Sequence, residues 1–228
     1  LLEKIDQGRI LYGTVLSIGS PVVTELLAQS GFDVLWLDME HSAIGLESLQ
    51  VNMMAARSGG TPAWVRIPWN DPVRAKAVLD IGADGIIFPF IRTVEEAELA
   101  VASCTYPPQG IRGFGPCRAA DYGRISMGEY VSSTYRECRR IIQIEHIDAV
   151  RNLREIAAVD GIDGFIVGPN DLSGSIGKLG QSRCEEMMEL YREIGSILKE
   201  AGKLAGIYAG EFNKEYIQQF LDMGYTMI

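Results

Sequence analysis

The sequence predicts an α/β fold, a (β/α)8 TIM barrel that occupies residues 1–228 as a single domain. Short apolar, β-rich runs alternate with helical patterns along the chain, which is the order of parallel strands joined by helices. The runs are mostly apolar throughout, as expected of strands that are covered on both faces. No run precedes a GxGxxG or GxxxxGK[ST] pattern, which argues against the nucleotide-binding form of the competing arrangement, a doubly wound open sheet.

Eight runs are predicted to be strands, the number that closes a barrel. They are 10-ILYGTVLS-17, 34-VLWLD-38, 63-AWVRI-67, 85-GIIFPF-90, 140-RIIQIE-145, 163-DGFIVG-168, 203-KLAGIY-208 and the start of a last strand, 225-YTMI-228. The chain opens without Met and stops where the last strand begins. We therefore expect a barrel trimmed at both ends, with its last helix missing.

Capping residues mark the ends of the predicted helices. The pattern over 20–31 starts with Ser20 as N-cap and Pro21 in the first turn, and it ends at Gly31. The pattern over 71–82 repeats this arrangement with Asp, Pro and Gly. Further helices are predicted over 93–103, 183–202 and 211–224.

Composition excludes several classes of protein. The formal net charge is −9, from 21 basic and 30 acidic residues, which argues against a general nucleic-acid surface. No apolar run approaches the roughly 18 residues that a membrane-spanning helix needs, and no signal-peptide pattern opens the chain. The four cysteines show no CxxC or zinc-ligand spacing, so we expect free thiols in a reducing cytoplasm.

Ionisable side chains and one amide gather at the carboxyl ends of the predicted strands, where the active sites of TIM barrels lie. These residues are Asp38, Glu40 and His41 after the second strand, Arg66 on the third, Gln143 and Glu145 on the fifth, and Asp171 after the sixth. Gln143 and Glu145 are two positions apart, so their side chains share one face of the strand. Each residue also has a structural reading, such as a helix cap for Asp171 or a neutralising ion pair for Arg66.

The set of side chains favours chemistry beside a carbonyl group. Two carboxylates favour a hard divalent ion such as Mg²⁺ or Mn²⁺, and the single histidine among them argues against a His-rich zinc site. An arginine near such an ion stabilises an enolate, and a histidine supplies a base with a pKa near neutrality. No lysine ends a predicted strand, which counts against a Schiff-base aldolase.

The chain resembles the metal-dependent (class II) pyruvate aldolases of the HpcH/HpaI family. The resemblance is carried, in order and over most of the chain, by GFDVLWLDMEH, VRIPWNDPVRAKAVLDIGADGIIFPF, YPPQGIRGFGP, IIQIE and DGFIVGPNDLSGSIG. It implies a (β/α)8 barrel and a homohexamer built as a trimer of dimers. It also implies reversible cleavage of 4-hydroxy-2-oxo acids to pyruvate and an aldehyde through a metal-stabilised enolate.

The resemblance assigns binding roles to particular residues of this chain. Glu145 and Asp171 match the ligands of a divalent metal, with Mg²⁺ or Mn²⁺ expected and Co²⁺ or Zn²⁺ as alternatives. The residues that match groups holding the pyruvate end are Gln143, Gly168, Pro169 and Asn170. Backbone N–H groups ahead of a helix suit a carboxylate.

The resemblance also assigns catalytic roles. Arg66 matches the arginine that stabilises the enolate oxygen, and His41 matches the general base that acts on the C4 hydroxyl. We expect Asp38 to orient water or that hydroxyl. Asp80 matches an aspartate that raises the basicity of the histidine, although it lies near the end of a predicted helix on the opposite side of the barrel. A neighbouring subunit is one way for Asp80 to act.

Two departures from the family affect the substrate. Relatives commonly carry an aromatic residue where this chain has Val15, and many carry a glutamate where it has Arg92. The aldehyde partner is therefore not inherited from any member. The long segment 104–139 is interpreted as part of the active-site rim, with Arg112, Arg118 and Tyr122 as residues that line the mouth.

Three alternatives to the aldolase remain. An oxaloacetate decarboxylase or a macrophomate-synthase-like enzyme would use the same enolate chemistry. A citrate-lyase β-type enzyme would act on CoA thioesters, but the motif around His41 and the short, acidic chain favour the aldolase. A non-catalytic barrel belongs to another class, and the intact set of Arg66, Glu145, Asp171 and His41 argues against it.

Overall fold

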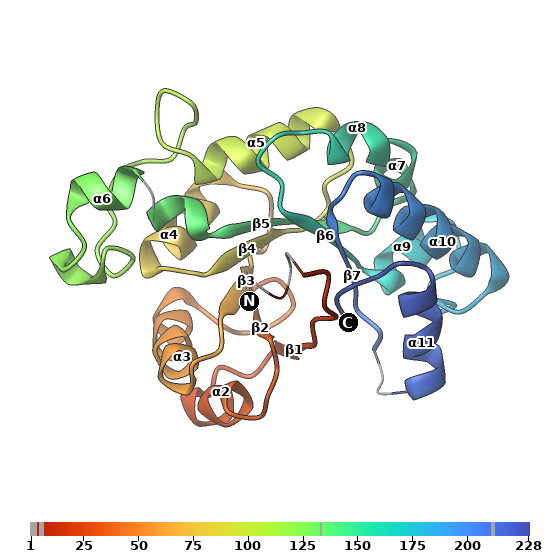
Figure 1. The fold of residues 1–228 in the computed structure, drawn as a ribbon, viewed down its shortest axis with the longest axis horizontal. Coiled ribbons are helices and arrows are strands. Elements are labelled where there is room, and N and C mark those ends of the chain that lie inside the picture. Colours follow the sequence, from red (N-terminus) through yellow and green to blue (C-terminus); the bar gives the residue numbers. More distant parts are fainter. Residues whose placement is uncertain (1–3, 5–6, 133, 211–212) are drawn as a thin grey trace. The chain divides into compact units, whose positions relative to one another are not determined.

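The structure of the protein, a computed structural model, describes residue 4 and residues 7–132, 134–210 and 213–228 (Figure 1). It divides into two compact units. The first comprises Tyr12–Phe88 and Leu99–Arg140, and the second comprises Pro89–Glu98, Ile141–Ile228 and the described part of Leu2–Leu11. That the chain forms one domain stays a prediction. In the described ranges, no helix has the length and apolarity to cross a membrane.

The first unit is built on buried parallel strands. They are β1 (Gly13–Leu16), β2 (Val34–Asp38), β3 (Ala63–Arg66) and β4 (Gly85–Phe88), and each pairs in parallel with the next. The helices that follow β1, β2 and β3 are α2 (Pro21–Ala28), α3 (Leu46–Gly59) and α4 (Pro72–Ile81), and α2 and α3 lie side by side (Figure 1). Ser20 caps α2 and Asp71 caps α4, as the sequence predicts.

The second unit repeats the same construction. Parallel pairing joins β5 (Arg139–Ile144), whose first two residues belong to the first unit, to β6 (Gly164–Val167), and β6 to β7 (Leu204–Ile207). The helices are α7 (Ile147–Arg151), α8 (Leu153–Ala157), α9 (Pro169–Ser175), α10 (Glu185–Glu200) and α11 (Lys214–Asp222), while α5 (Val94–Cys104) belongs partly to each unit. The predicted start of the last helix, 211–212, lies outside the described residues.

The prediction of a closed (β/α)8 barrel is wrong. The described residues form an α/β fold with one seven-stranded sheet, in the order β1 to β7. The predicted eighth strand, 225–228, pairs only through isolated parallel bridges from Met227 to Leu11 and to Gly206. Pairing through a single residue is too short to build the eighth strand of a barrel wall.

The segment between α5 and β5 is anchored at the end of α4. It contains α6 (Met127–Ser132) and two single-turn 3₁₀ helices, Asp121–Gly123 and Thr134–Glu137. The buried guanidinium of Arg112 donates to Asp80 at 2.8 Å, and Arg118 donates to the carbonyl of Ile81 at 2.5 Å. The carboxyl end of α4 leads into the amino end of β4, so Arg112 and Arg118 do not line a mouth at the carboxyl ends of the strands. Asp121, next to Tyr122, pairs with Arg57 in the last turn of α3, which leads into the amino end of β3. The interpretation of this part of the segment, with Arg112, Arg118 and Tyr122, as an active-site rim is wrong.

Gly85 allows β4 to pack against Trp64 of β3. The two residues are register partners, and a Cβ atom at position 85 would collide with the fully buried indole. We expect Gly85→Ala to lower the free energy of unfolding by about 1–3 kcal/mol because neither strand can move away. Urea unfolding at neutral pH measures this change.

Gly45→Ala is the matched control. Position 45 precedes α3, has φ of −88°, and has no atom within 4 Å of the place where a Cβ would stand. Its effect should stay within about 0.5 kcal/mol. Equal losses for the two variants would show that the contact with Trp64 does not limit stability.

Candidate active site

Arg66 and Asp38 form a buried ion pair at the carboxyl ends of β3 and β2. The two residues are register partners on neighbouring parallel strands. Arg66 Nε donates to Asp38 Oδ1 at 2.9 Å, and Arg66 Nη2 donates to Asp38 Oδ2 at 2.7 Å. Only 10% of the Arg66 side chain and 4% of the Asp38 side chain are exposed. This two-pronged geometry holds the guanidinium in one orientation.

Two further side chains hold Arg66. Glu40 Oε2 lies 3.1 Å from Arg66 Nη1, and the guanidinium lies 5.0 Å from the ring centre of Trp36. Trp36 and Asp38 are two positions apart on β2, so they present their side chains on one face. The indole Nε1–H of Trp36 is buried without an acceptor in the described part of the chain. Arg66 therefore sits between two carboxylates and an aromatic face.

His41 lies at the edge of this cluster. Its side chain is 63% exposed, and Nε2 is 3.7 Å from Glu40 Oε2. Its backbone N–H donates to Asp38 Oδ1 at 3.4 Å, and the N–H of Glu40 donates to the same oxygen at 3.0 Å. Asp38 therefore shapes the loop that carries His41. Its hydrogen bonds go to Arg66 and to this loop.

The charge on Asp38 is stabilised by its neighbours. Burial raises the pKa of this carboxyl, but the hydrogen bonds and the charge of Arg66, together with the N–H groups of Glu40 and His41, lower it by more. The pKa of Asp38 therefore lies below its ordinary value of 3.8. Asp38 is ionised at neutral pH and neutralises part of the charge of Arg66.

The second unit carries a buried carboxylate directly after β5. Glu145 is 1% exposed. Its Oε2 accepts a hydrogen bond from Gln143 Nε2 at 2.7 Å, and its Oε1 accepts one from the backbone N–H of Phe90, also at 2.7 Å. The expectation that Gln143 and Glu145 share one face is confirmed, and the amide of Gln143 orients the carboxylate.

Gly168 brings the backbone after β6 against this carboxylate. A Cβ atom there would stand 2.9 Å from both Gln143 Nε2 and Glu145 Oε2. The N–H of Gly168 donates to the carbonyl of Ile144, and Pro169 has no N–H. Of the three predicted substrate-binding positions at 168–170, only Asn170 has a backbone N–H that is available to a substrate carboxylate.

Asp171 lies in the first turn of α9 and is half-buried. It is not the cap of this helix, because the N-cap position belongs to Gly168. Within the described residues its carboxylate makes no hydrogen bond or ion pair. Both of its oxygens are therefore available to a ligand.

The second unit fits a hard divalent cation through few protein ligands. Glu145 and Asp171 offer carboxylate oxygens, the donors that Mg²⁺ and Mn²⁺ prefer. A side chain at position 168 would displace the carboxylate of Glu145, so the glycine keeps Glu145 in its place. Among the described residues no group of three or more His, Cys, Asp or Glu side chains is arranged as a metal site. A cation held by these two carboxylates would take its remaining ligands from water or substrate.

Asp80 is paired with Arg112. Its Oδ1 accepts from Arg112 Nη2, which also donates to the hydroxyl of Tyr130 at 3.1 Å, and the guanidinium stacks 4.7 Å from the ring centre of Tyr106. The Arg112 side chain is 1% exposed. The structure therefore gives Asp80 a structural partner, and its predicted action on His41 stays a prediction.

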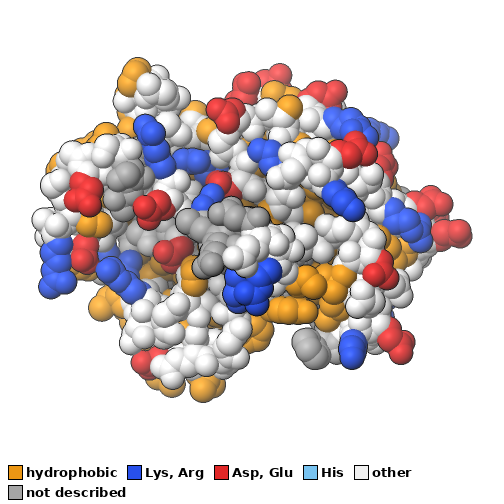
Figure 2. All heavy atoms as spheres, in the orientation of Figure 1, with side chains coloured by type: hydrophobic (Ala, Val, Ile, Leu, Met, Phe, Trp, Pro, Cys, Tyr) orange, Lys and Arg blue, Asp and Glu red, His pale blue; other side chains and the backbone are white. Residues whose placement is uncertain are grey.

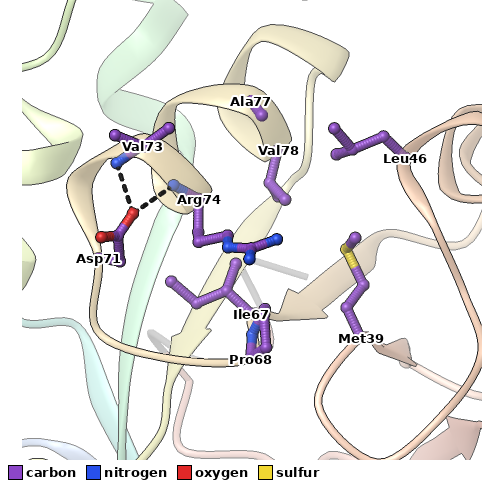
Figure 3. Close-up of a pocket in the computed structure, with 9 residues that line it drawn as sticks. All are labelled: Met39, Leu46, Ile67, Pro68, Asp71, Val73, Arg74, Ala77 and Val78. Atoms are coloured by element: carbon purple, nitrogen blue, oxygen red, sulfur yellow. Dashed lines mark hydrogen bonds between the residues drawn. The ribbon is translucent and has the colours of Figure 1, made fainter.

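The first unit also contains an apolar pocket of about 380 Å³ (Figure 3). Its walls are Met39, Leu46, Ile67, Pro68, Asp71, Val73, Arg74, Ala77 and Val78. Met39 follows Asp38 and Ile67 follows Arg66, so strand alternation directs these side chains away from the ion pair. The pocket is distinct from the Arg66 cluster.

Charges of both signs are interspersed on the face of the molecule in Figure 2. This distribution lacks the basic stripe that a phosphate backbone requires, and the net charge of −9 adds to that argument.

Comparison with known proteins identifies the family. The profile described as "HpcH/HpaI aldolase/citrate lyase" matches residues 13–228. The chain belongs to this family. A curated relative, the 5-keto-4-deoxy-D-glucarate aldolase of Escherichia coli strain K12, is 34% identical over 221 residues, which cover 96% of this chain and 85% of the relative. The protein is an enzyme, a carbon–carbon lyase of the aldolase class, and the predicted resemblance is confirmed.

Solved structures agree with this assignment. An HpcH/HpaI aldolase/citrate lyase family protein from Burkholderia cenocepacia J2315 matches with a TM-score of 0.93 and 32% identity, covering 99% of this chain and 90% of that one. Macrophomate synthase matches with a TM-score of 0.84 and 27% identity, covering 100% and 80%. The citrate lyase beta subunit from M. tuberculosis, solved with oxaloacetate and magnesium, matches with a TM-score of 0.61 and 17% identity, covering 98% of this chain and 92% of that one. This is a likeness in fold alone.

The sequence did not predict the roles of three residues of the site. Trp36 could have been predicted, because it lies two positions before Asp38 on a strand and so shares its face. Glu40 was left without a role, and the structure places it against Arg66. Phe90 had no signal, because nothing in the sequence indicates that a phenylalanine backbone donates to Glu145.

The first site prediction concerns the pH dependence of stability. Because the pKa of Asp38 is lower in the folded state, its ion pair stabilises the fold above the ordinary pKa of 3.8, and this stabilisation is lost as pH falls through the folded-state pKa. Asp38→Asn should lower the free energy of unfolding by about 3 kcal/mol at neutral pH. The difference from wild type should narrow as pH falls below 3.8, because the unfolded wild-type chain then binds a proton at Asp38 that the ion pair in the folded state resists. Urea unfolding from pH 7 to pH 3 tests this.

The exposed Asp222 supplies the control for that series. Its carboxylate accepts a hydrogen bond from Gln218 within α11. Asp222→Asn should change stability by less than about 0.5 kcal/mol at any pH in the series. A pH-independent gap between wild type and Asp38→Asn would contradict the explanation.

The second site prediction concerns Asp80. Asp80→Ala leaves the buried guanidinium of Arg112 without its carboxylate, so the free energy of unfolding should fall by about 3 kcal/mol. Asp80→Asn keeps an acceptor and should lose less. If Asp80 acts only through Arg112, aldolase activity per folded molecule changes little in both variants. Unchanged thermal stability together with a large loss of activity would instead support a role toward His41.

Proposed function

We propose that the protein is a divalent-metal-dependent aldolase that cleaves 4-hydroxy-2-oxo acids to pyruvate and an aldehyde. The observation that carries this proposal is the buried guanidinium of Arg66, held by Asp38 and Glu40 at the ends of β2 and β3. A cation fixed in this way stabilises negative charge on an enolate oxygen without reorganising during the reaction. The relatives named as keto-acid aldolases support the same chemistry.

Each candidate residue takes one step in this scheme. His41, exposed beside Glu40, removes the proton of the C4 hydroxyl and so starts the cleavage of the C3–C4 bond. Arg66 holds the oxygen that gains charge as pyruvate enolate forms. Asn170, through its backbone N–H, binds the carboxylate of the pyruvate end.

The metal would be held in the second unit. Glu145, oriented by Gln143 and the N–H of Phe90, and Asp171 supply carboxylate ligands. A bound Mg²⁺ or Mn²⁺ supplies Lewis-acid polarisation of the 2-oxo group. Enzymes of this family generally depend on a divalent metal. Co²⁺ and Zn²⁺ are alternatives to be compared in the assay.

A second candidate function is oxaloacetate decarboxylation or macrophomate-synthase-like chemistry. The likeness to macrophomate synthase over the whole chain favours this alternative. It uses the same enolate and requires no base at C4. The substrate range therefore separates the two functions.

The assembly is implied by the family resemblance and the location by the cysteine usage, and both stay predictions. We propose a homohexamer arranged as a trimer of dimers in the cytoplasm, with a small 2-oxo acid as the binding partner. Size-exclusion chromatography with light scattering measures the mass of the assembly.

An assay of pyruvate release tests the function. The purified protein is incubated with Mg²⁺ or Mn²⁺ and with a panel of 4-hydroxy-2-oxo acids and oxaloacetate. We expect metal-dependent pyruvate from the hydroxy-oxo acids, with loss of activity on addition of EDTA or in Glu145→Gln. Pyruvate from oxaloacetate alone would support the decarboxylase. If the protein binds no divalent metal and Glu145→Gln is fully active, the assignment of the metal site fails.

The role of His41 has its own test. His41→Ala should lower kcat for aldol cleavage by about 100-fold or more, because it removes the group proposed to accept the C4 hydroxyl proton. Oxaloacetate decarboxylation should change little. His146→Asn is the control, because His146 caps α7 through Nδ1 and asparagine is also a good cap. Equal loss of both activities in His41→Ala would remove His41 from the role of base.

A further inference from the structure

Phe90 has a backbone conformation that a phenylalanine seldom adopts. Its φ is +55°, in the left-handed region, two residues after β4 ends at Phe88. A bulky residue at positive φ is an outlier, because its Cβ approaches the backbone carbonyl. Such strain persists only where the surrounding structure imposes it, and it concentrates at functional sites. The conformation of Phe90 therefore calls for a function that an ordinary turn residue would not serve.

The left-handed conformation accompanies a hydrogen bond from the backbone to Glu145. The N–H of Phe90 donates to Glu145 Oε1 at 2.7 Å, and Gln143 donates to Oε2 at the same distance. Both bonds have the short length of hydrogen bonds to an ionised acceptor. Since Glu145 is 1% exposed, bulk water has little access to this carboxylate.

The two donors determine what the carboxylate can still do. An ionised carboxylate has about four acceptor sites, two on each oxygen. With a donor on each oxygen, the plane of the carboxylate is fixed. Outer partners of this kind orient metal ligands in many proteins.

We propose that Phe90 is a positioning residue, whose left-handed backbone holds Glu145 in the orientation that binds a divalent cation. This inference rests on the proposed role of Glu145 as a metal ligand. It assigns the function to the main chain of Phe90, so the informative substitutions are those that change its backbone preference.

Three substitutions separate this role from a structural turn. Phe90→Gly keeps the N–H and adopts positive φ without strain. Phe90→Val introduces a β-branched residue, for which positive φ is strongly unfavourable. The backbone at position 90 should therefore leave the left-handed region, and its N–H should lose the hydrogen bond to Glu145. Tyr122→Val is the control, because Tyr122 has φ of +55° on an exposed 3₁₀ turn of the first unit.

Isothermal titration with MgCl₂ and with MnCl₂, in the absence of substrate, measures the Kd. We expect Phe90→Val to weaken binding by about 10-fold to 100-fold. Phe90→Gly and Tyr122→Val should bind like the wild type. In hydrogen exchange, the amide of residue 90 should be protected in the wild type and in Phe90→Gly, and exposed in Phe90→Val.

The outcomes distinguish this inference from the proposed function. If the wild type binds the cation and Phe90→Val binds it equally well, the positioning role is wrong and the aldolase proposal stands. If the wild type binds neither cation, both fail. If Phe90→Val does not fold, Phe90→Ala replaces it, because alanine also disfavours positive φ. Wild-type affinity in a folded Phe90→Ala that has lost amide protection would likewise overturn the inference.

Discussion

The ion pair between Arg66 and Asp38 is the constraint around which the first unit is organised. An arginine at a strand end inside a protein is costly to bury unless it is paired and hydrogen-bonded. Asp38 meets that requirement with both oxygens, and it can do so because the register places the two residues opposite each other on parallel strands. The same carboxylate accepts the N–H groups of Glu40 and His41. The carboxylate of Asp38 thus fixes both the guanidinium of Arg66 and the loop that carries the candidate base, His41.

The second unit buries a charged group of the opposite sign, the carboxylate of Glu145. Glu145 is buried more deeply than Arg66, and it accepts hydrogen bonds from a side-chain amide and from a strained backbone N–H. Gly168 then brings a third strand end within contact distance of it. In each unit a charged group is fixed before any ligand arrives. Preorganised charges of this kind are the main source of rate enhancement in reactions that develop an oxyanion.

Some elements of the fold could be predicted from the sequence and others could not, for physical reasons. The strands from β2 to β7 were predicted to within two residues at either end, because their apolar runs are bounded by caps and glycines. The helix α3 was not predicted, since it begins after Gly45 without a side-chain cap and so has no start signal. The prediction of a closed barrel failed because a strand pattern shows where a strand lies and not whether the last strand forms a continuous ladder of hydrogen bonds with its neighbours. Candidate site residues were found wherever a charge ended a strand. The partners of Asp80 and the donor at Phe90 depend on tertiary packing and backbone strain, which a linear pattern does not encode.

The contact at Gly168 sets a narrow limit on how this chain can change through evolution. The two atoms nearest to an added methyl group are Gln143 Nε2 and Glu145 Oε2, at the ends of their side chains, so alanine would displace these two side chains first. The substitution would then change the orientation of the Glu145 carboxylate more than the packing of the core. Under the proposed function, a single nucleotide change from a glycine codon to an alanine codon would therefore impair the binding of a metal ion at Glu145 more than it impairs folding.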